Sequence, residues 1–237
     1  MGNLEQKETV FGNLLKQVFL PMVIYYVISN AFVILGLSIM QLLKTNAVME
    51  SFSEAFLENF ILYMETFIKM AGMALGGAAV FPYFKRENSY KEQKSLSRKI
   101  IVCMIAAGAV LSLGINYLFS VTGFTQSSEQ YSRVAEAQFA LPLWLALIFY
   151  GILSPVVEEV VFRGIICNAL ERNTTKVMGM VGSALLFGAF HGNIVQMVYA
   201  SLMGGIMAYI YQRYQNLLVP VLFHGAANIA IYMVTYF

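Results

Sequence analysis

The segment Glu158-Glu159-Val160-Val161-Phe162-Arg163 contains the only two adjacent acidic residues of the chain. Residues four apart share one face of a helix, so Arg163 is predicted to pair with Glu159. Glu158 is rotated by about 100° from its neighbour and stays without that partner. A carboxylate left free in this way can act as a general base. The alternative is a helix end that carries ordinary surface charges into the cytoplasm.

Both histidines of the chain lie in apolar segments that are rich in small residues. His191 ends the segment Phe187-Gly188-Ala189-Phe190-His191, where a lone histidine is also typical of a hydrogen-bonded core residue. His224 and Asn228 are four apart with only Gly and Ala between them, so they share a helix face beside open space. Two such donors can hold an oxyanion, although interhelical hydrogen bonding would explain the same pair.

The composition shows which elements must position these residues. Of the 237 residues, 59% are hydrophobic and 12% are charged, and the mean hydropathy is +0.67. A soluble domain carries about 25% charged residues. We therefore expect one integral membrane domain over 1–237, with N-terminal helices in 1–140 and a catalytic core in 141–237.

The fold class predicted from the apolar segments is all-α, a polytopic transmembrane bundle. A span needs about 20 apolar residues. A proline within a helix favours a kink or a break, so Pro155 would make the piece after it an eighth segment. Seven segments qualify: 18–43, 60–84, 100–124, 141–157, 177–191, 194–211 and 217–237.

Charges in the loops predict how the chain is oriented. Lysines and arginines are concentrated in 85–99 and acidic residues in 44–58, so the basic loop and the N-terminus are expected on the cytoplasmic side. The basic loop is expected to contact lipid headgroups, and no nucleic-acid partner is predicted.

Within the second segment, Glu65 and Lys69 are four apart and are expected to form an internal ion pair, with a functional relay as the alternative.

One expectation is in tension with this arrangement. At 1.5 Å per residue, His191 lies about 22 Å from Lys176 along a helix. The active site is expected nearer the cytoplasmic side, close to Glu158 and His224. The three residues meet only if the helices tilt strongly, or if the first residues after Lys176 lie at the membrane interface.

The motifs EExxxR, FxxxH and HxxxN, in this order on successive membrane helices, resemble the CAAX prenyl protease and bacteriocin-processing family of intramembrane proteases. That family includes type II CAAX endopeptidases, which cleave after a prenylated cysteine. The resemblance covers roughly Leu141 to Phe237. It implies that Glu158 activates water with help from His191, and that His224 and Asn228 stabilise the oxyanion. The supporting residues that it implies are Glu159, Arg163 and Phe187.

The resemblance also limits cofactors and substrates. No cofactor is favoured, because HExxH is absent; zinc is the alternative, bound by Glu158, His191 and His224. The implied partner is a membrane-associated peptide or a prenylated protein. Two other functions stay open, a non-catalytic immunity or peptide-binding protein on the same scaffold and a small transporter. Aspartyl intramembrane proteases are excluded, because the chain contains no Asp.

Overall fold

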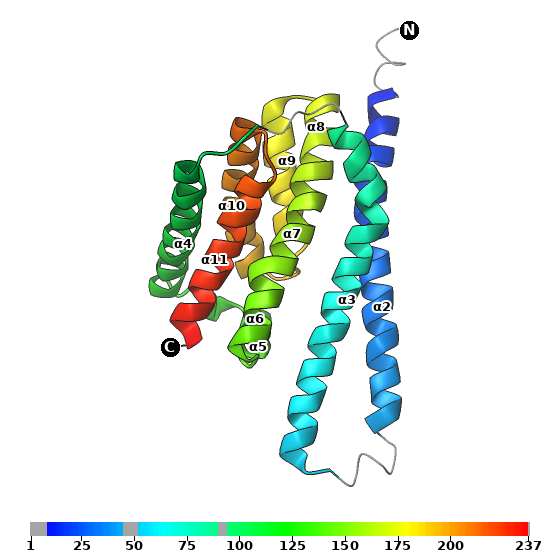
Figure 1. Ribbon diagram of the computed structural model, residues 1–237, viewed down its shortest axis with the longest axis vertical. Helices are drawn as coiled ribbons and strands as arrows, with labels where there is room; N and C mark the ends of the chain where they lie inside the picture. Colours follow the sequence, from blue (N-terminus) through cyan, green and yellow to red (C-terminus); the bar gives the residue numbers. More distant parts are fainter. Residues whose placement is uncertain (1–8, 45–51, 90–93, 237) are drawn as a thin grey trace.

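A computed structural model describes residues 9–44, 52–89 and 94–236, and every regular element in these ranges is helical. The all-α prediction is therefore confirmed for the described residues. A wide π-helical turn, Leu15–Phe19, precedes the first long helix. The helices, named as in Figure 1, are α2 (Leu20–Lys44), α3 (Glu54–Asn88), α4 (Arg98–Val121), α5 (Glu129–Phe139), α6 (Leu143–Ile148), α7 (Ser154–Glu159), α8 (Asn168–Asn173), α9 (Lys176–Ala189), α10 (Ile194–Tyr214) and α11 (Leu218–Tyr236).

Six helices in the described ranges are long and apolar enough to cross a membrane. The segment predicted at 177–191 is present as α9, but it has 14 residues and is shorter than a span. The eighth segment predicted after Pro155 is wrong, because α6, α7 and α8 join into one helix, Leu143–Asn173, which we call the central helix. Pro155 follows the π-helical turn Phe149–Leu153, and such a turn accommodates a residue that lacks an N–H.

The central helix is the most enclosed of the candidate spans, with 50% of its apolar window buried. Its second half carries Val161, Phe162, Ile165 and Ile166, each at most 1% exposed. Helices pack around this half on every side, so residues of all kinds are removed from lipid there. Polar side chains at this position must consequently find partners inside the protein.

The N-terminal helices form a pair of their own beside the rest of the bundle. α2 and α3 lie side by side, and their ends near residues 44 and 54 extend beyond the other helices (Figure 1). Gly76 makes this contact close, since a Cβ there would lie 2.9 Å from the Tyr25 carbonyl oxygen. Close approach through small residues is how helices pack in lipid, where no hydrophobic effect drives them together.

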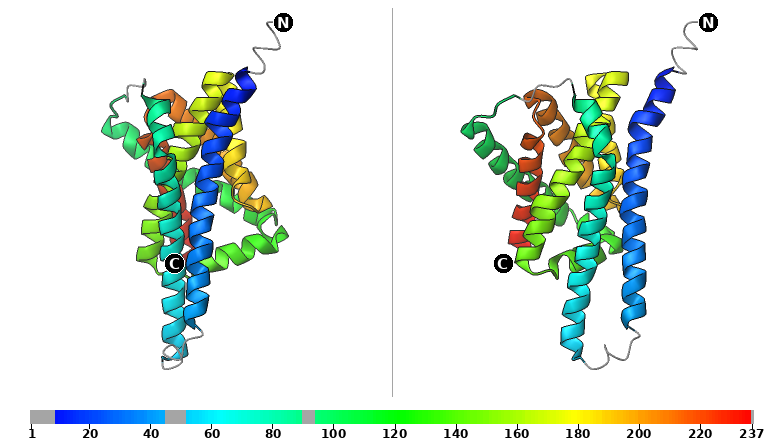
Figure 2. Two further views of the ribbon diagram at one scale, coloured as in Figure 1. Left: turned by 90° about the vertical axis from the view of Figure 1, so that its right-hand side faces the viewer. Right: turned by 45° about the vertical axis from the view of Figure 1, so that its right-hand side comes forward.

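α9 and α10 form a hairpin that starts and ends at the same side of the bundle as α8 (Figures 1 and 2). The hairpin turns back part-way along the central helix, and His191 lies in this turn. Asn193 begins α10, and its side chain accepts a hydrogen bond from the Gln196 backbone at 2.9 Å. The short α9 therefore delivers its last residues to the interior of the bundle.

α5 was not predicted from the sequence. It lies across the other helices on the side away from α8 (Figure 2). The Ser128 hydroxyl caps it by accepting from the Tyr131 backbone at 3.2 Å. Its outer face carries the exposed pair Glu129 and Arg133, while Gln138 and Phe139 are half-buried.

Candidate active site

Glu159 and Arg163 form the ion pair that their spacing predicts. Arg163 Nη1 lies 2.9 Å from Glu159 Oε1, and both side chains are 0% exposed. Arg163 Nη2 also donates to the Gly204 carbonyl oxygen of α10 at 3.1 Å. The guanidinium carbon lies 4.5 Å from the ring centre of Phe187 on α9. Arg163 thus connects the central helix to both arms of the α9–α10 hairpin.

His224 is a second partner of Glu159. Its Nδ1 lies 2.9 Å from Glu159 Oε1, the oxygen that also accepts from Arg163. An ionised carboxylate only accepts hydrogen bonds, so Nδ1 of His224 carries the proton. The other ring nitrogen, Nε2, lies 3.7 Å from Glu158 Oε2. His224 on α11 is therefore held between the two adjacent glutamates, which the sequence did not reveal.

Glu158 faces open space where Glu159 does not. Its side chain is 15% exposed, against 0% for Glu159. As predicted, it is not paired with Arg163. However, it is not free of partners, because the Ser154 hydroxyl donates to Glu158 Oε1 at 2.6 Å. Ser154 was missed in the sequence, although its position one helical turn before Glu158 could have identified it.

His191 and Asn228 line the same cavity as Glu158 and His224. His191 Nδ1 lies 2.9 Å from the Phe187 carbonyl oxygen, which can only accept. Nε2 of His191 consequently presents a lone pair. Asn228 Nδ2 donates to the carbonyl oxygen of Tyr150 at 2.9 Å. The expected difficulty with the depth of His191 does not arise, because the α9–α10 turn lies inside the bundle.

Phe187 forms a wall shared by these groups. Its ring centre lies 5.0 Å from that of His191 and 5.7 Å from that of His224, both at edge-on angles. The same ring covers the Arg163 guanidinium. An aromatic ring in this position restricts the orientation of both imidazoles and keeps the ion pair dry.

Gly225 explains why α11 approaches the central helix so closely. A Cβ at Gly225 would lie 2.5 Å from the Gly151 carbonyl oxygen, a distance that no real side chain tolerates. Gly151 precedes Pro155 by four residues, so its carbonyl lacks the usual helical donor. The missing side chain at Gly225 thus brings His224 and Asn228 against the part of the helix that carries Glu158.

The cavity around these residues lies between the α2–α3 pair, α5 and the central helix. The site cavity, as we call it, is lined by Tyr25, Ser29, Asn30, Val33, Lys69, Met73, Val134, Gln138, Phe149, Tyr150, Ser154, Glu158, Phe190, His191, Gln196, His224 and Asn228. A second, mostly apolar cavity shares His191, His224 and Asn228 with it and extends beneath α5 to Met203 and Met207.

The donor set does not fit the zinc alternative. Among the described residues, no three His, Cys or Glu side chains are grouped so that they could hold a metal ion. In both histidines Nδ1 is engaged, by Glu159 for His224 and by a carbonyl for His191, so only Nε2 of each ring remains open. The chemistry below is therefore derived without a metal.

The predicted ion pair between Glu65 and Lys69 is not formed. No nitrogen–oxygen contact within 4.0 Å joins them, although both belong to the described part of α3. Lys69 is exposed and lines the site cavity. The i,i+4 spacing permits such a pair, but the two flexible side chains adopt other positions here.

Comparison with known proteins identifies the region that contains the site. Residues 140–230 match a family described as type II CAAX prenyl endopeptidase Rce1-like. This part of the chain is therefore similar to the Rce1-like family. The match includes every motif residue from Glu158 to Asn228 and leaves α2, α3, α4 and α5 outside it. The resemblance seen in the sequence is therefore confirmed for the helices that build the site.

One curated protein is also similar to this chain. It comes from Bacillus subtilis (strain 168), is described as "Putative membrane peptidase YdiL", and is 30% identical over 122 residues. The aligned part is 51% of this chain and 49% of the relative, so the chain spans about half the length of that relative. No solved structure matches the chain significantly. The descriptions of the family and of this relative both name peptidases.

Proposed function

We propose that this protein is an intramembrane endopeptidase that hydrolyses a peptide bond of a membrane-associated peptide or a lipidated protein. The observation that carries the proposal is the placement of Glu158 against His224 in one cavity, with the buried Glu159–Arg163 pair behind them. A buried charge is costly unless it is paired, and the Glu159–Arg163 pair is fully enclosed. Glu158 is instead left facing the cavity, where a water molecule and a substrate can meet it.

In the proposed reaction, Glu158 takes a proton from a water molecule, and the resulting hydroxide attacks the carbonyl carbon of the peptide bond. Nε2 of His191 assists by accepting a hydrogen bond from the same water. The tetrahedral intermediate then collapses, the C–N bond breaks, and Glu158 returns the proton to the leaving amine. General acid–base catalysis of this kind contributes about 10²–10⁴-fold to a rate.

The negatively charged oxygen of that intermediate is stabilised by hydrogen-bond donors. Asn228 has a second N–H beyond the one given to Tyr150, and His224 can donate through Nε2 when both ring nitrogens are protonated. Glu159 then offsets the positive charge of the ring. Loss of one such donor typically costs about 10²–10³-fold in kcat.

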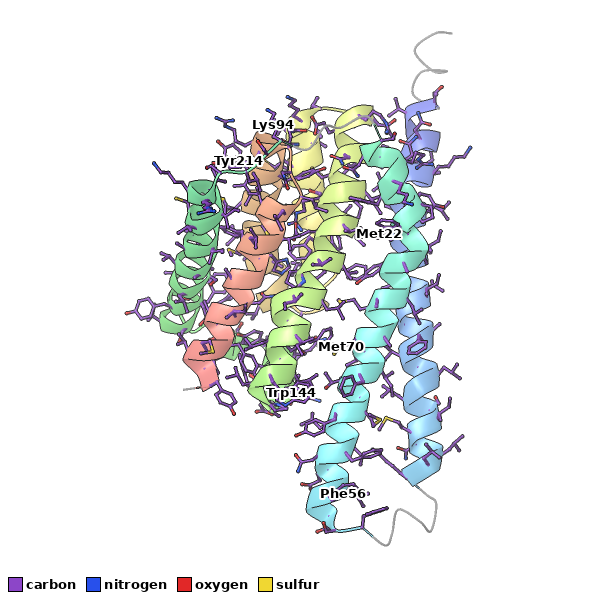
Figure 3. All side chains as sticks on the ribbon, in the orientation of Figure 1. Met22, Phe56, Met70, Lys94, Trp144 and Tyr214 are labelled. Carbon is purple, nitrogen blue, oxygen red and sulfur yellow. The ribbon has the colours of Figure 1, made fainter. Side chains whose placement is uncertain are left out.

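The proposed orientation places the N-terminus and the open end of the α9–α10 hairpin in the cytoplasm. Lys94 lies at that end with Tyr214, while Phe56 lies at the opposite end (Figure 3). Arg172 in the last turn of α8 and Lys176 at the start of α9 flank the connection between these helices, at the same end as Lys94. Positive charge in short loops favours the cytoplasmic side.

The test is cleavage of quenched membrane-soluble peptides by purified protein in detergent. Wild type and Glu158→Gln are compared, with Glu171→Gln as the matched control on the same helix but outside the site cavity. The peptide set includes prenylated and unprenylated members. We expect cleavage by wild type and Glu171→Gln, and a loss of at least about 100-fold in Glu158→Gln.

A parallel series with EDTA or 1,10-phenanthroline tests the role of metal. Cleavage that persists with both chelators supports the glutamate mechanism. Cleavage that is lost with them indicates that the reaction depends on a bound metal ion. Peptide binding by wild type without cleavage of any peptide would contradict the proposal and favour the peptide-binding alternative.

A further inference from the structure

Lys69 is a charged side chain for which the proposed chemistry has no use. It lies in the middle of α3, between the apolar residues Ile68 and Met70. No hydrogen bond or ion pair engages it within the described part of the chain, and the partner expected from the sequence, Glu65, is not in contact. Charged residues within membrane helices are costly and usually face the interior of the bundle for a functional reason.

The position of Lys69 points to a ligand in the site cavity. Its side chain lines that cavity from α3, while Glu158 and His224 line it from the central helix and α11. Lys69 is the only lysine or arginine among the described residues that line the cavity. An anion entering this space is repelled by Glu158 and attracted by Lys69, so it would come to rest on the α2–α3 side.

A single ammonium group suits an anion with one charge. Proteins commonly hold phosphate groups with several charged or N–H donors together, such as arginine clusters or a lysine supplemented by backbone N–H groups. The cavity around Lys69 offers instead neutral polar side chains, namely Ser29, Asn30 and Gln138. This combination of one cation with neutral donors matches a carboxylate.

We propose that Lys69 binds a carboxylate of the peptide substrate and thereby fixes the direction in which the peptide lies across Glu158. The inference rests on the proposed function and adds a determinant of specificity from outside the residues that match the Rce1-like family. The carboxylate is either the free C-terminus of the peptide or an acidic side chain.

The experiment uses one quenched peptide in matched forms. One pair differs only in a C-terminal acid or amide, and a second pair only in an internal Glu or Gln. We measure kcat and KM for wild type, Lys69→Met, Lys69→Arg and the control Lys85→Met, which removes the same charge from the same helix outside the cavity. Lys69→Gln is the second neutral variant if Lys69→Met does not fold.

We expect wild type to prefer the acid form of one peptide pair by roughly 5- to 30-fold in kcat/KM, mainly through a lower KM. A hydrogen bond to a charged group is strong, but the exposure of Lys69 to solvent weakens it. Lys69→Met should lose the preference, so that its kcat/KM values for the acid and neutral peptides become equal. Lys69→Arg should retain most of the preference, and Lys85→Met all of it. The pair that shows the preference identifies the source of the carboxylate.

Two results would overturn the inference without affecting the proposed function. They are equal cleavage of acid and neutral peptides by wild type, and a preference that persists in both neutral variants at position 69. If wild type cleaves nothing, the proposed function fails, and binding of the same peptides to purified protein still decides the role of Lys69. A preference in binding that disappears in Lys69→Met supports that role, and equal binding of acid and neutral forms rejects it.

Discussion

The buried pair Glu159–Arg163 leads to a prediction that separates folding from catalysis. Removing one partner leaves the other charge buried without the counter-ion that it has now, because both side chains are 0% exposed. Such changes cost about 3–5 kcal/mol, whereas replacing both members of a buried pair by neutral groups is much less damaging. We therefore expect Glu159→Gln and Arg163→Met each to lose about 3–5 kcal/mol of unfolding free energy.

The double variant gives the sharper result. We expect it to lose about 3 kcal/mol in total, well below the sum of the single losses, which corresponds to a coupling of at least about 3 kcal/mol. Unfolding is followed by far-ultraviolet circular dichroism during titration with SDS in mixed micelles. The exposed pair Glu129–Arg133 on α5 has the same spacing and a 2.7 Å contact, and serves as the control with a coupling below about 1 kcal/mol.

Activity should not follow stability in this series. Glu159 Oε1 lies 2.9 Å from His224 Nδ1, so Gln at this position cannot offset a positive charge on the ring. We expect the double variant to stay at least roughly 100-fold below wild type in kcat even where it is fully folded. Additive stability losses would refute the buried pair as a coupled unit. Recovery of activity together with stability would show that Glu159 acts in folding alone.

Two further substitutions test the contacts around Glu158 and His224. Ser154→Ala removes the 2.6 Å hydrogen bond to Glu158. We expect this change to lower kcat by about 10-fold with little change in the free energy of unfolding. An unchanged kcat would show that Ser154 does not position the base. Gly225→Ala places a Cβ 2.5 Å from the Gly151 carbonyl oxygen, so we expect it to lose about 1–3 kcal/mol of stability and most activity. Gly205→Ala is the control, because no heavy atom lies within 4 Å of a Cβ added at this position. It should be neutral or slightly stabilising. Equal effects of the two alanine substitutions on stability and activity would contradict the close approach of α11 at Gly225.

The sequence by itself determined what depends on local helical geometry. Hydropathy over about 20 residues predicted the long helices, because each must satisfy its own backbone in lipid. The spacing of four predicted the Glu159–Arg163 pair, which forms at 2.9 Å. The same rule predicted an ion pair between Glu65 and Lys69 that is not formed, because spacing permits a contact without requiring it.

The sequence was less reliable for the π-helical turns of the central helix and for the short polar helix α5. Pro155 was expected to kink or break the central helix, and the helix is continuous through it, with π-helical turns on either side. α5 escaped notice because a short polar helix has neither the length nor the hydropathy of a span. These elements depend on what packs against them, which local periodicity does not contain.

The tertiary structure alone decided which side chains meet. His224 is 65 residues from Glu159, and its place between the two glutamates depends on how closely α11 approaches the central helix. That distance depends on the absence of a side chain at Gly225, and the depth of His191 depends on the early turn of the α9–α10 hairpin. Contacts between helices arise from packing between segments far apart in the chain, so spacing within one helix cannot predict them.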